Sequence, residues 1–218
     1  MSGRMGAALL VLCAVLGACA SEAEQPRLLG SRTPRVTVGE TPAELEALLL
    51  SASDVRDIDG FEGAEASDLD DLELYENPDP RGPCGRPMDA LPTPDGGRVF
   101  STEDGTFVEL VWADGQEIEG MIGDFDADLR PGCGSHESTT NQGLTQEASE
   151  PVPIDTTGIG DRAIGWTATL RVSGQTAGAG MVVAVEGGRA VLVQQIAPEV
   201  EGEQLADLAR AAAERAGG

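Results

Sequence analysis

Apolar and polar residues alternate along much of the second half of the chain, and this is the spacing of β-strands. The clearest case runs from Ile164 to Val172, where every second residue is apolar. Two pairs of β-rich runs are each separated by a short turn that contains glycine: residues 98–102 with 106–112, and residues 181–185 with 189–196. Runs joined in this way are typical of β-hairpins. The pattern therefore predicts neighbouring strands that pair antiparallel.

Other segments place their apolar residues at helical spacing. Residues 118–129 and 203–216 each have one apolar side and predict two helices. Two shorter helices are predicted from capping boxes, in which a Ser or Thr and an acidic residue three positions later satisfy the first N–H groups. These pairs are Thr41 with Glu44, and Ser51 with Asp54.

Together these elements predict one α+β domain over residues 41–218. Strands joined by tight turns form an antiparallel sheet, and amphipathic helices bury their apolar sides against it. We expect the helices to pack mainly on one face of that sheet, with an α-helix at the C-terminus.

Residues 1–18 have the pattern of a secretory signal peptide. Arg4 precedes an apolar run that ends at Leu16 and is shorter than the ~20 residues a bilayer span needs. The segment Leu16-Gly17-Ala18-Cys19 then resembles the bacterial lipobox, which ends on the cysteine that receives lipid. We expect a lipid such as palmitate on Cys19, and hence a lipoprotein on the extracytoplasmic face of the cell membrane.

Two alternatives to this anchor stay open. Cys13 is a second cysteine in the segment, although a bulky leucine directly precedes it, and an ordinary signal peptidase could cut after Ala18 or Ala20. Residues 19–40 show no apolar periodicity and contain two prolines, so we expect a flexible tether.

The charge of the chain excludes some partners. It carries 38 acidic residues against 14 basic ones, all arginine, for a net charge of −24. Such a chain repels phosphate backbones and anionic headgroups, so we expect no nucleic-acid partner and a membrane link only through the lipid. The abundance of alanine, glycine and arginine indicates a high-GC genome such as that of an actinobacterium.

The cysteines predict one disulfide. Removal of the signal peptide leaves Cys19, Cys84 and Cys133, and lipid on Cys19 leaves a single pair in an oxidising compartment. Neither Cys84 nor Cys133 lies in a CxxC motif, which argues against redox catalysis and structural zinc.

No set of residues predicts catalysis, a metal site or a cofactor. Asp124, Asp126 and Asp128 lack the glycine and glutamate of an EF-hand loop, and a helix would spread their carboxylates around its axis. His136 is the only histidine, and the chain has no GxSxG motif. We therefore expect that the protein is not an enzyme, and its ligand-binding residues stay unassigned.

Three stretches resemble the extracellular sensor domain of an actinobacterial receptor serine/threonine kinase, a PknH-like sensor domain. They are residues 48–55, the turn at 158–163 with the strand that follows it, and the valine-rich hairpin before the last helix. The resemblance extends over residues 41–216 in layout and implies a sensor domain with a cleft. This chain offers one disulfide where the kinase domain has two. Small actinobacterial lipoproteins of unknown function share much of the same layout.

The function that we expect is a membrane-anchored extracytoplasmic lipoprotein with a sensor-like or ligand-binding domain and no catalysis. Its partners would be the membrane, through the lipid, and an unknown small ligand or envelope protein. The alternatives are an envelope lipid carrier, which needs a large apolar cavity, and a carboxylate-based envelope hydrolase, which needs convergent acidic residues.

Overall fold

The structure is a computed structural model that describes residues 35–36, 41–69, 74–75, 81–129, 133–139 and 145–218. The predicted signal peptide at 1–18, Cys19 and most of the predicted tether at 19–40 lie outside the described residues. Within the tether, strand β1 (Arg35–Val36) pairs antiparallel with β3 (Leu74–Tyr75), a pairing that the sequence does not predict.

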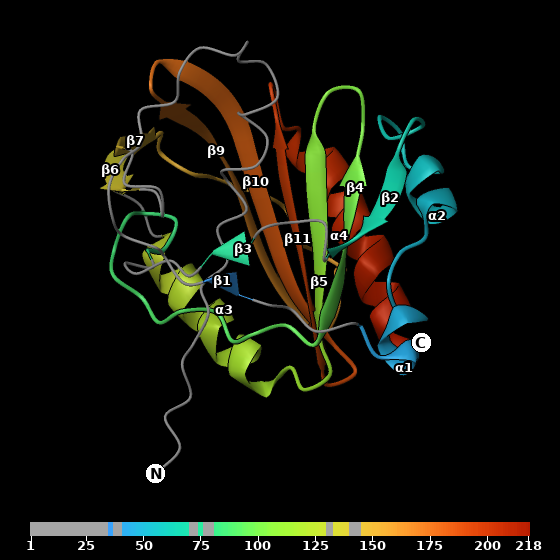
Figure 1. Ribbon diagram of the computed structural model, residues 1–218. Helices are drawn as coiled ribbons and strands as arrows, with labels where there is room; N and C mark the ends of the chain where they lie inside the picture. The colour runs from blue at the N-terminus through green and yellow to red at the C-terminus, as the bar shows by residue number, and fades with distance from the viewer. Residues whose placement is uncertain (1–34, 37–40, 70–73, 76–80, 130–132, 140–144) are drawn as a thin grey trace.

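The centre of the molecule is a nine-stranded antiparallel sheet (Figure 1). Its strands follow the order β2-β4-β5-β11-β10-β9-β7-β6, and β8 pairs with β9 beside this path. The bounds are β2 Glu65–Asp68, β4 Gly96–Ser101, β5 Thr106–Trp112, β6 His136–Thr139, β7 Thr145–Ala148, β8 Val152–Pro153, β9 Arg162–Val172, β10 Gln175–Glu186 and β11 Arg189–Ala197. The predicted strand at Ile164 to Val172 forms the greater part of β9.

Both predicted hairpins are present. Ser101 pairs with Thr106 at the β4–β5 turn, and Glu186 pairs with Arg189 at the β10–β11 turn. The two central residues of the second turn, Gly187 and Gly188, have φ values of +56° and +81°. Two positive φ angles are what a tight hairpin turn between twisted strands requires, and glycine adopts them without steric cost.

Four helices lie in the described part of the chain: α1 Ala43–Glu46, α2 Ala52–Arg56, α3 Gln116–Asp128 and α4 Gly202–Gly217. Together with the sheet they confirm the predicted α+β class. No helix among the described residues is long and apolar enough to cross a membrane.

The capping box at α2 is confirmed, because Ser51 and Asp54 exchange hydrogen bonds with each other's backbone N–H groups. The predicted cap at Thr41 is wrong. Helix α1 begins after Pro42 without a side-chain cap, and the Thr41 hydroxyl instead accepts a hydrogen bond from the Gly97 N–H at 3.3 Å. A long-range contact with β4 thus replaces the local one.

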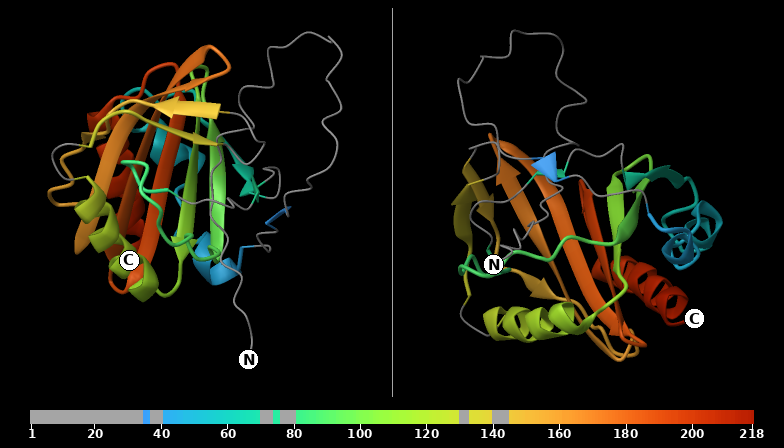
Figure 2. Two further views of the ribbon diagram at one scale, coloured as in Figure 1. Left: turned by 90° about the vertical axis from the view of Figure 1, so that its left-hand side faces the viewer. Right: turned by 60° about the horizontal axis from the view of Figure 1, so that its bottom comes forward.

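Helices cover both faces of the sheet, with α4, α1 and α2 on one face and α3 on the other (Figure 2, right). Three of the four described helices share one face, as predicted. On that face Leu205 and Leu208 of α4 pack with the strands, and neither side chain is exposed. On the other face Ile118 and Ile122 of α3 pack against the opposite side of the same central strands.

Helix α4 approaches β10 closely because β10 carries glycine where the helix begins. A Cβ atom at Gly180 would lie 2.6 Å from Cδ2 of Leu205, which is far inside van der Waals contact. The pairing of β10 with both neighbours continues through this position without a bulge. Gly180 therefore serves the packing of the helix, whereas a strand glycine can equally mark a bulge.

We predict that Leu208→Ala lowers the free energy of unfolding by about 2–5 kcal/mol, because a fully buried leucine side chain is replaced by a cavity. Urea unfolding followed by circular dichroism measures the change. Glu214→Ala, at an exposed position of the same helix, is the matched control and should change little. Equal stability of the Leu208→Ala variant and the wild type would contradict the packing of α4 on the sheet.

Candidate functional site

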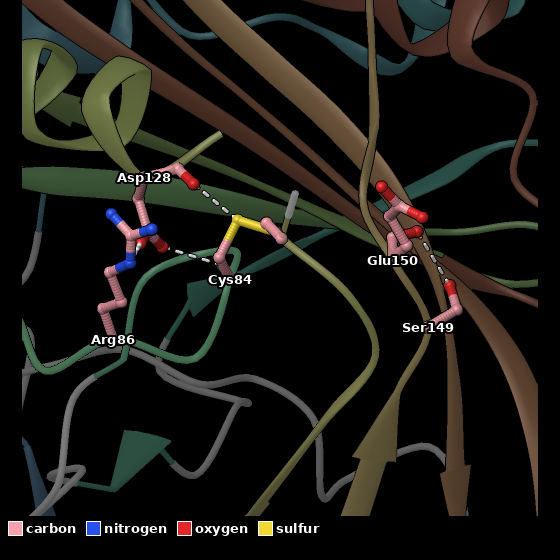
Figure 3. Close-up of a disulfide and its surroundings, with 6 residues drawn as sticks. Cys84, Arg86, Asp128, Ser149 and Glu150 are labelled. Atoms are coloured by element: carbon pink, nitrogen blue, oxygen red, sulfur yellow. Dashed lines mark hydrogen bonds and ion pairs between the residues drawn. A yellow bond between two sulfur atoms is a disulfide. The ribbon is translucent and has the colours of Figure 1, made fainter. Parts of the chain in front are cut away.

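A disulfide connects the loop at residues 81–87 to the chain just beyond α3 (Figure 3). Cys84 and Cys133 are bonded, and their Cα atoms lie 5.5 Å apart, within the range of ordinary disulfides. This is the pairing that the cysteine count predicts. The bridge joins positions 49 residues apart and so fixes an irregular loop against a helix end.

Asp128 is the polar centre of this disulfide region. It is the last residue of α3, is 6% exposed, and accepts a hydrogen bond from the Cys84 N–H at 2.7 Å. The Arg86 Nε lies 3.3 Å from its other carboxylate oxygen (Figure 3). A carboxylate at a helix C-terminus meets the negative end of the helix dipole. The Cys84 N–H and the Arg86 guanidinium offset that cost, which couples the loop to the helix end.

Two glycines give this region its shape. A Cβ atom at Gly82 would overlap the Asp128 carboxylate, so only glycine lets the loop approach so closely. Gly85 has a φ of +73°, and a Cβ atom there would overlap the His136 ring. The structure thus places His136, the single histidine of the chain, at the start of β6 and against the disulfide loop.

A second polar centre lies inside the sheet, at Glu109 of β5. Its side chain is on the α4 face between those of Phe107 and Val111, and its exposed fraction is 0%. One carboxyl oxygen accepts the Leu50 N–H at 2.9 Å, and the other has no hydrogen-bond partner among the described residues. Burial raises the pKa of Glu109 to about 8, against the opposing effects of the Leu50 N–H and of Arg98.

Arg98 binds the backbone of the same residue, Leu50, through its carbonyl group. It pairs with Glu109 across β4 and β5, and its guanidinium donates to the Leu50 carbonyl at 2.7 Å. It also reaches Glu46 of α1 at 3.3 Å. The N–H and the C=O of Leu50 are therefore both bound by side chains of the sheet, and these bonds fasten the α1–α2 connection to it.

The structure brings together only some of the residues that the sequence singles out. Cys84 and Cys133 meet, whereas Cys19 lies outside the described residues. Asp124 and Asp126 are exposed, while Asp128 turns inward to the disulfide loop. The described residues contain no group of three His, Cys, Asp or Glu side chains that could hold a metal ion.

Sequence reasoning missed Glu109. A signal was present, because Glu109 is the only charged residue in the otherwise apolar run from Phe107 to Trp112. A strand that is apolar on both sides is buried on both sides, and a carboxyl within it is buried too.

The fold resembles one that is already known in a solved structure. The crystal structure of the extracellular domain of PknH from Mycobacterium tuberculosis has a TM-score of 0.51 and 13% sequence identity to this chain. The match covers 85% of this chain and 98% of that one. No protein-family model matches the sequence, and no curated protein does so either.

At 13% identity the similarity concerns the fold alone. It confirms the predicted resemblance in fold to a PknH extracellular domain, over most of both chains. The lipid anchor and the actinobacterial origin are not part of this finding and stay predictions.

We predict that replacing both cysteines, with Cys84→Ser and Cys133→Ser together, lowers the free energy of unfolding by about 4 kcal/mol. The bridge restricts the unfolded chain between positions 49 residues apart, and its loss restores that entropy. Urea unfolding with and without a thiol reductant measures the effect. The reductant should destabilise the wild type and leave the double variant unchanged; a wild type indifferent to complete reduction would contradict the prediction.

Proposed function

We propose that this protein is a lipid-anchored extracytoplasmic lipoprotein whose domain at residues 41–218 is a sensor-like or ligand-binding module without catalytic activity. The observation that carries the proposal is the fold, which matches an extracellular domain of a kinase over 98% of that domain's length. An extracellular domain of this kind acts by contact with a ligand or a partner, and we transfer that role to this chain.

The arrangement of the buried carboxyl groups supports a binding role over hydrolysis. The two buried carboxyl groups of the described residues are those of Glu109 and Asp128. Glu109 faces the α4 side of the sheet, whereas Asp128 ends α3 on the other side, so they cannot act on one substrate. Each also binds a backbone N–H of a neighbouring loop. A pair of carboxyl groups that shares a substrate, as a hydrolase of this type needs, is not formed by them.

The proposed location rests on three features. The Leu16-Gly17-Ala18-Cys19 segment supplies the lipidation site. Residues 19–40 are the proposed tether between the lipid and the domain. The Cys84–Cys133 bridge is of a kind that persists in oxidising compartments outside the cytoplasm. The strongly negative chain adds no electrostatic attraction to anionic lipids, which favours a covalent anchor.

We predict that Cys19→Ala abolishes fatty-acid labelling and moves the protein from the membrane fraction to the soluble extracytoplasmic fraction. Metabolic labelling with a radioactive or clickable palmitate, followed by fractionation, measures both. Cys13→Ala is the matched control and should be labelled like the wild type. Equal labelling of the wild type and the Cys19→Ala variant would refute the proposed lipid anchor.

We predict further that the domain retains a bound molecule when it is isolated from its own envelope. Native mass spectrometry of the Cys19→Ala variant is suited to this test, because no lipid on the protein itself contributes to the mass. The expected result is a mass above that of the chain, which is lost after denaturation. Unliganded protein that instead turns over envelope esters or glycosides would favour the hydrolase.

A further inference from the structure

The segment at residues 41–64 contains α1 and α2 and lies on the α4 face of the sheet. Its apolar side chains, including Leu49, Leu50 and Val55, are buried there. At the middle of the segment, the backbone of Leu50 is bound by two side chains of opposite kind. Glu109 accepts its N–H and Arg98 donates to its C=O. Both side chains come from the sheet, and neither has a second backbone contact of this kind in the segment.

The charged groups around Glu109 come from β4, α2 and α4. Arg98 lies beside it on β4, Asp54 belongs to α2, and Arg215 belongs to α4. Its neighbour across β5 and β11 is the apolar Val193. Asp54 and Arg215 form an ion pair at 3.0 Å, and Arg98 reaches Glu46 of α1. The nearby charges thus have partners of their own, and the second oxygen of Glu109 has none among the described residues.

We propose that the Glu109–Leu50 contact is a pH-sensitive latch, which holds the α1–α2 segment closed while Glu109 is protonated and loosens it when Glu109 ionises. The uncharged carboxyl can lie in an apolar layer and still accept the Leu50 N–H. An ionised carboxylate in the same place needs more hydrogen bonds or water, because a buried charge without them is costly. Opening of the segment admits that water. The buried leucines keep the segment attached, so ionisation increases the open fraction and does not detach it.

The direction of the effect follows from proton linkage. In the closed protein the pKa of Glu109 is raised from its ordinary 4.5 to about 8, whereas in an opened segment it returns toward 4.5. The latch is therefore at full strength below about pH 4.5, weakens as the pH rises toward 8, and is lost above it. Within that window the ratio of closed to open forms falls by up to about tenfold for each pH unit, since one proton is exchanged. The pKa of Asp54 is lowered, chiefly by the Ser51 hydroxyl, so Asp54 stays ionised throughout.

Hydrogen exchange of the whole chain, resolved by residue and corrected for the intrinsic effect of pH, tests the latch. Between pH 5.5 and 7.5 the protection of the Leu50 and Val55 amides should fall by up to about 100-fold in the wild type. In Glu109→Gln, which keeps an oxygen acceptor for Leu50 but cannot ionise, the fall should be absent. Glu147→Gln is the matched control: it removes the same charge at an exposed position and should behave like the wild type.

An equal loss of protection in the wild type and in Glu109→Gln would overturn the proposal. If Glu109→Gln does not fold, the test is an NMR titration of the wild type, in which the chemical shift of the Glu109 carboxyl carbon is followed against pH. A midpoint well above 4.5 that coincides with the loss of Leu50 protection supports the latch, and a midpoint near 4.5 refutes it. The test needs neither a ligand nor the lipid, so its result is independent of the proposed function.

Discussion

Close packing of α4 on the central strands determines much of the rest of the structure. The helix packs Leu205, Leu208 and a row of buried alanines against β10 and β11. Where the helix begins, β10 has a glycine, Gly180, which leaves room for Leu205. Small residues on both sides bring the helix and the sheet near to each other, in a chain in which aromatic residues make up only 3%. With α3 on the opposite face, β5, β10 and β11 are buried on both sides. Polar groups on these strands must then find partners inside the protein.

Glu109 on β5 and Asp128 at the end of α3 are both buried, and each carboxyl group binds a backbone N–H group of another segment. Glu109 accepts the N–H of Leu50, and Asp128 accepts the N–H of Cys84. Each thereby fixes an irregular segment on one side of the sheet, and an arginine binds nearby in both cases, Arg98 to the first segment and Arg86 to Asp128. The contact between Asp128 and its loop is reinforced by the disulfide. In the proposed latch, the strength of the contact between Glu109 and Leu50 depends on whether Glu109 is protonated. We therefore expect the disulfide region to respond to reduction and the segment at residues 41–64 to respond to pH.

The sequence predicted the parts of this structure that depend on neighbouring residues. The alternation in β9, the two hairpins and the apolar sides of α3 and α4 are all local patterns, and the cysteine count left one pair. It could not predict contacts between distant positions. Glu109 and Leu50 are 59 residues apart. Thr41 does not cap the helix that follows it, and its hydroxyl accepts a hydrogen bond from Gly97, 56 residues away. In both cases the tertiary contact supplies a partner that no local pattern specifies. The sequence can therefore indicate a buried carboxyl group at Glu109 but not the residue that it binds.

The similarity of fold at 13% identity has the same physical origin. Alternating strands, glycine-containing turns and a small-residue helix can be encoded by many sequences, so the layout persists while individual residues change. The layout alone therefore says little about what a particular chain recognises. Recognition depends on the irregular segments and on the polar groups that position them, because backbone N–H groups in loops need specific partners while strands satisfy their own. In this chain those segments are residues 41–64, positioned by Glu109 and Arg98, and the loop at 81–87, positioned by Asp128 and the disulfide. For the proposed binding module, we therefore expect contacts with a ligand or partner where these two segments meet the sheet and α3.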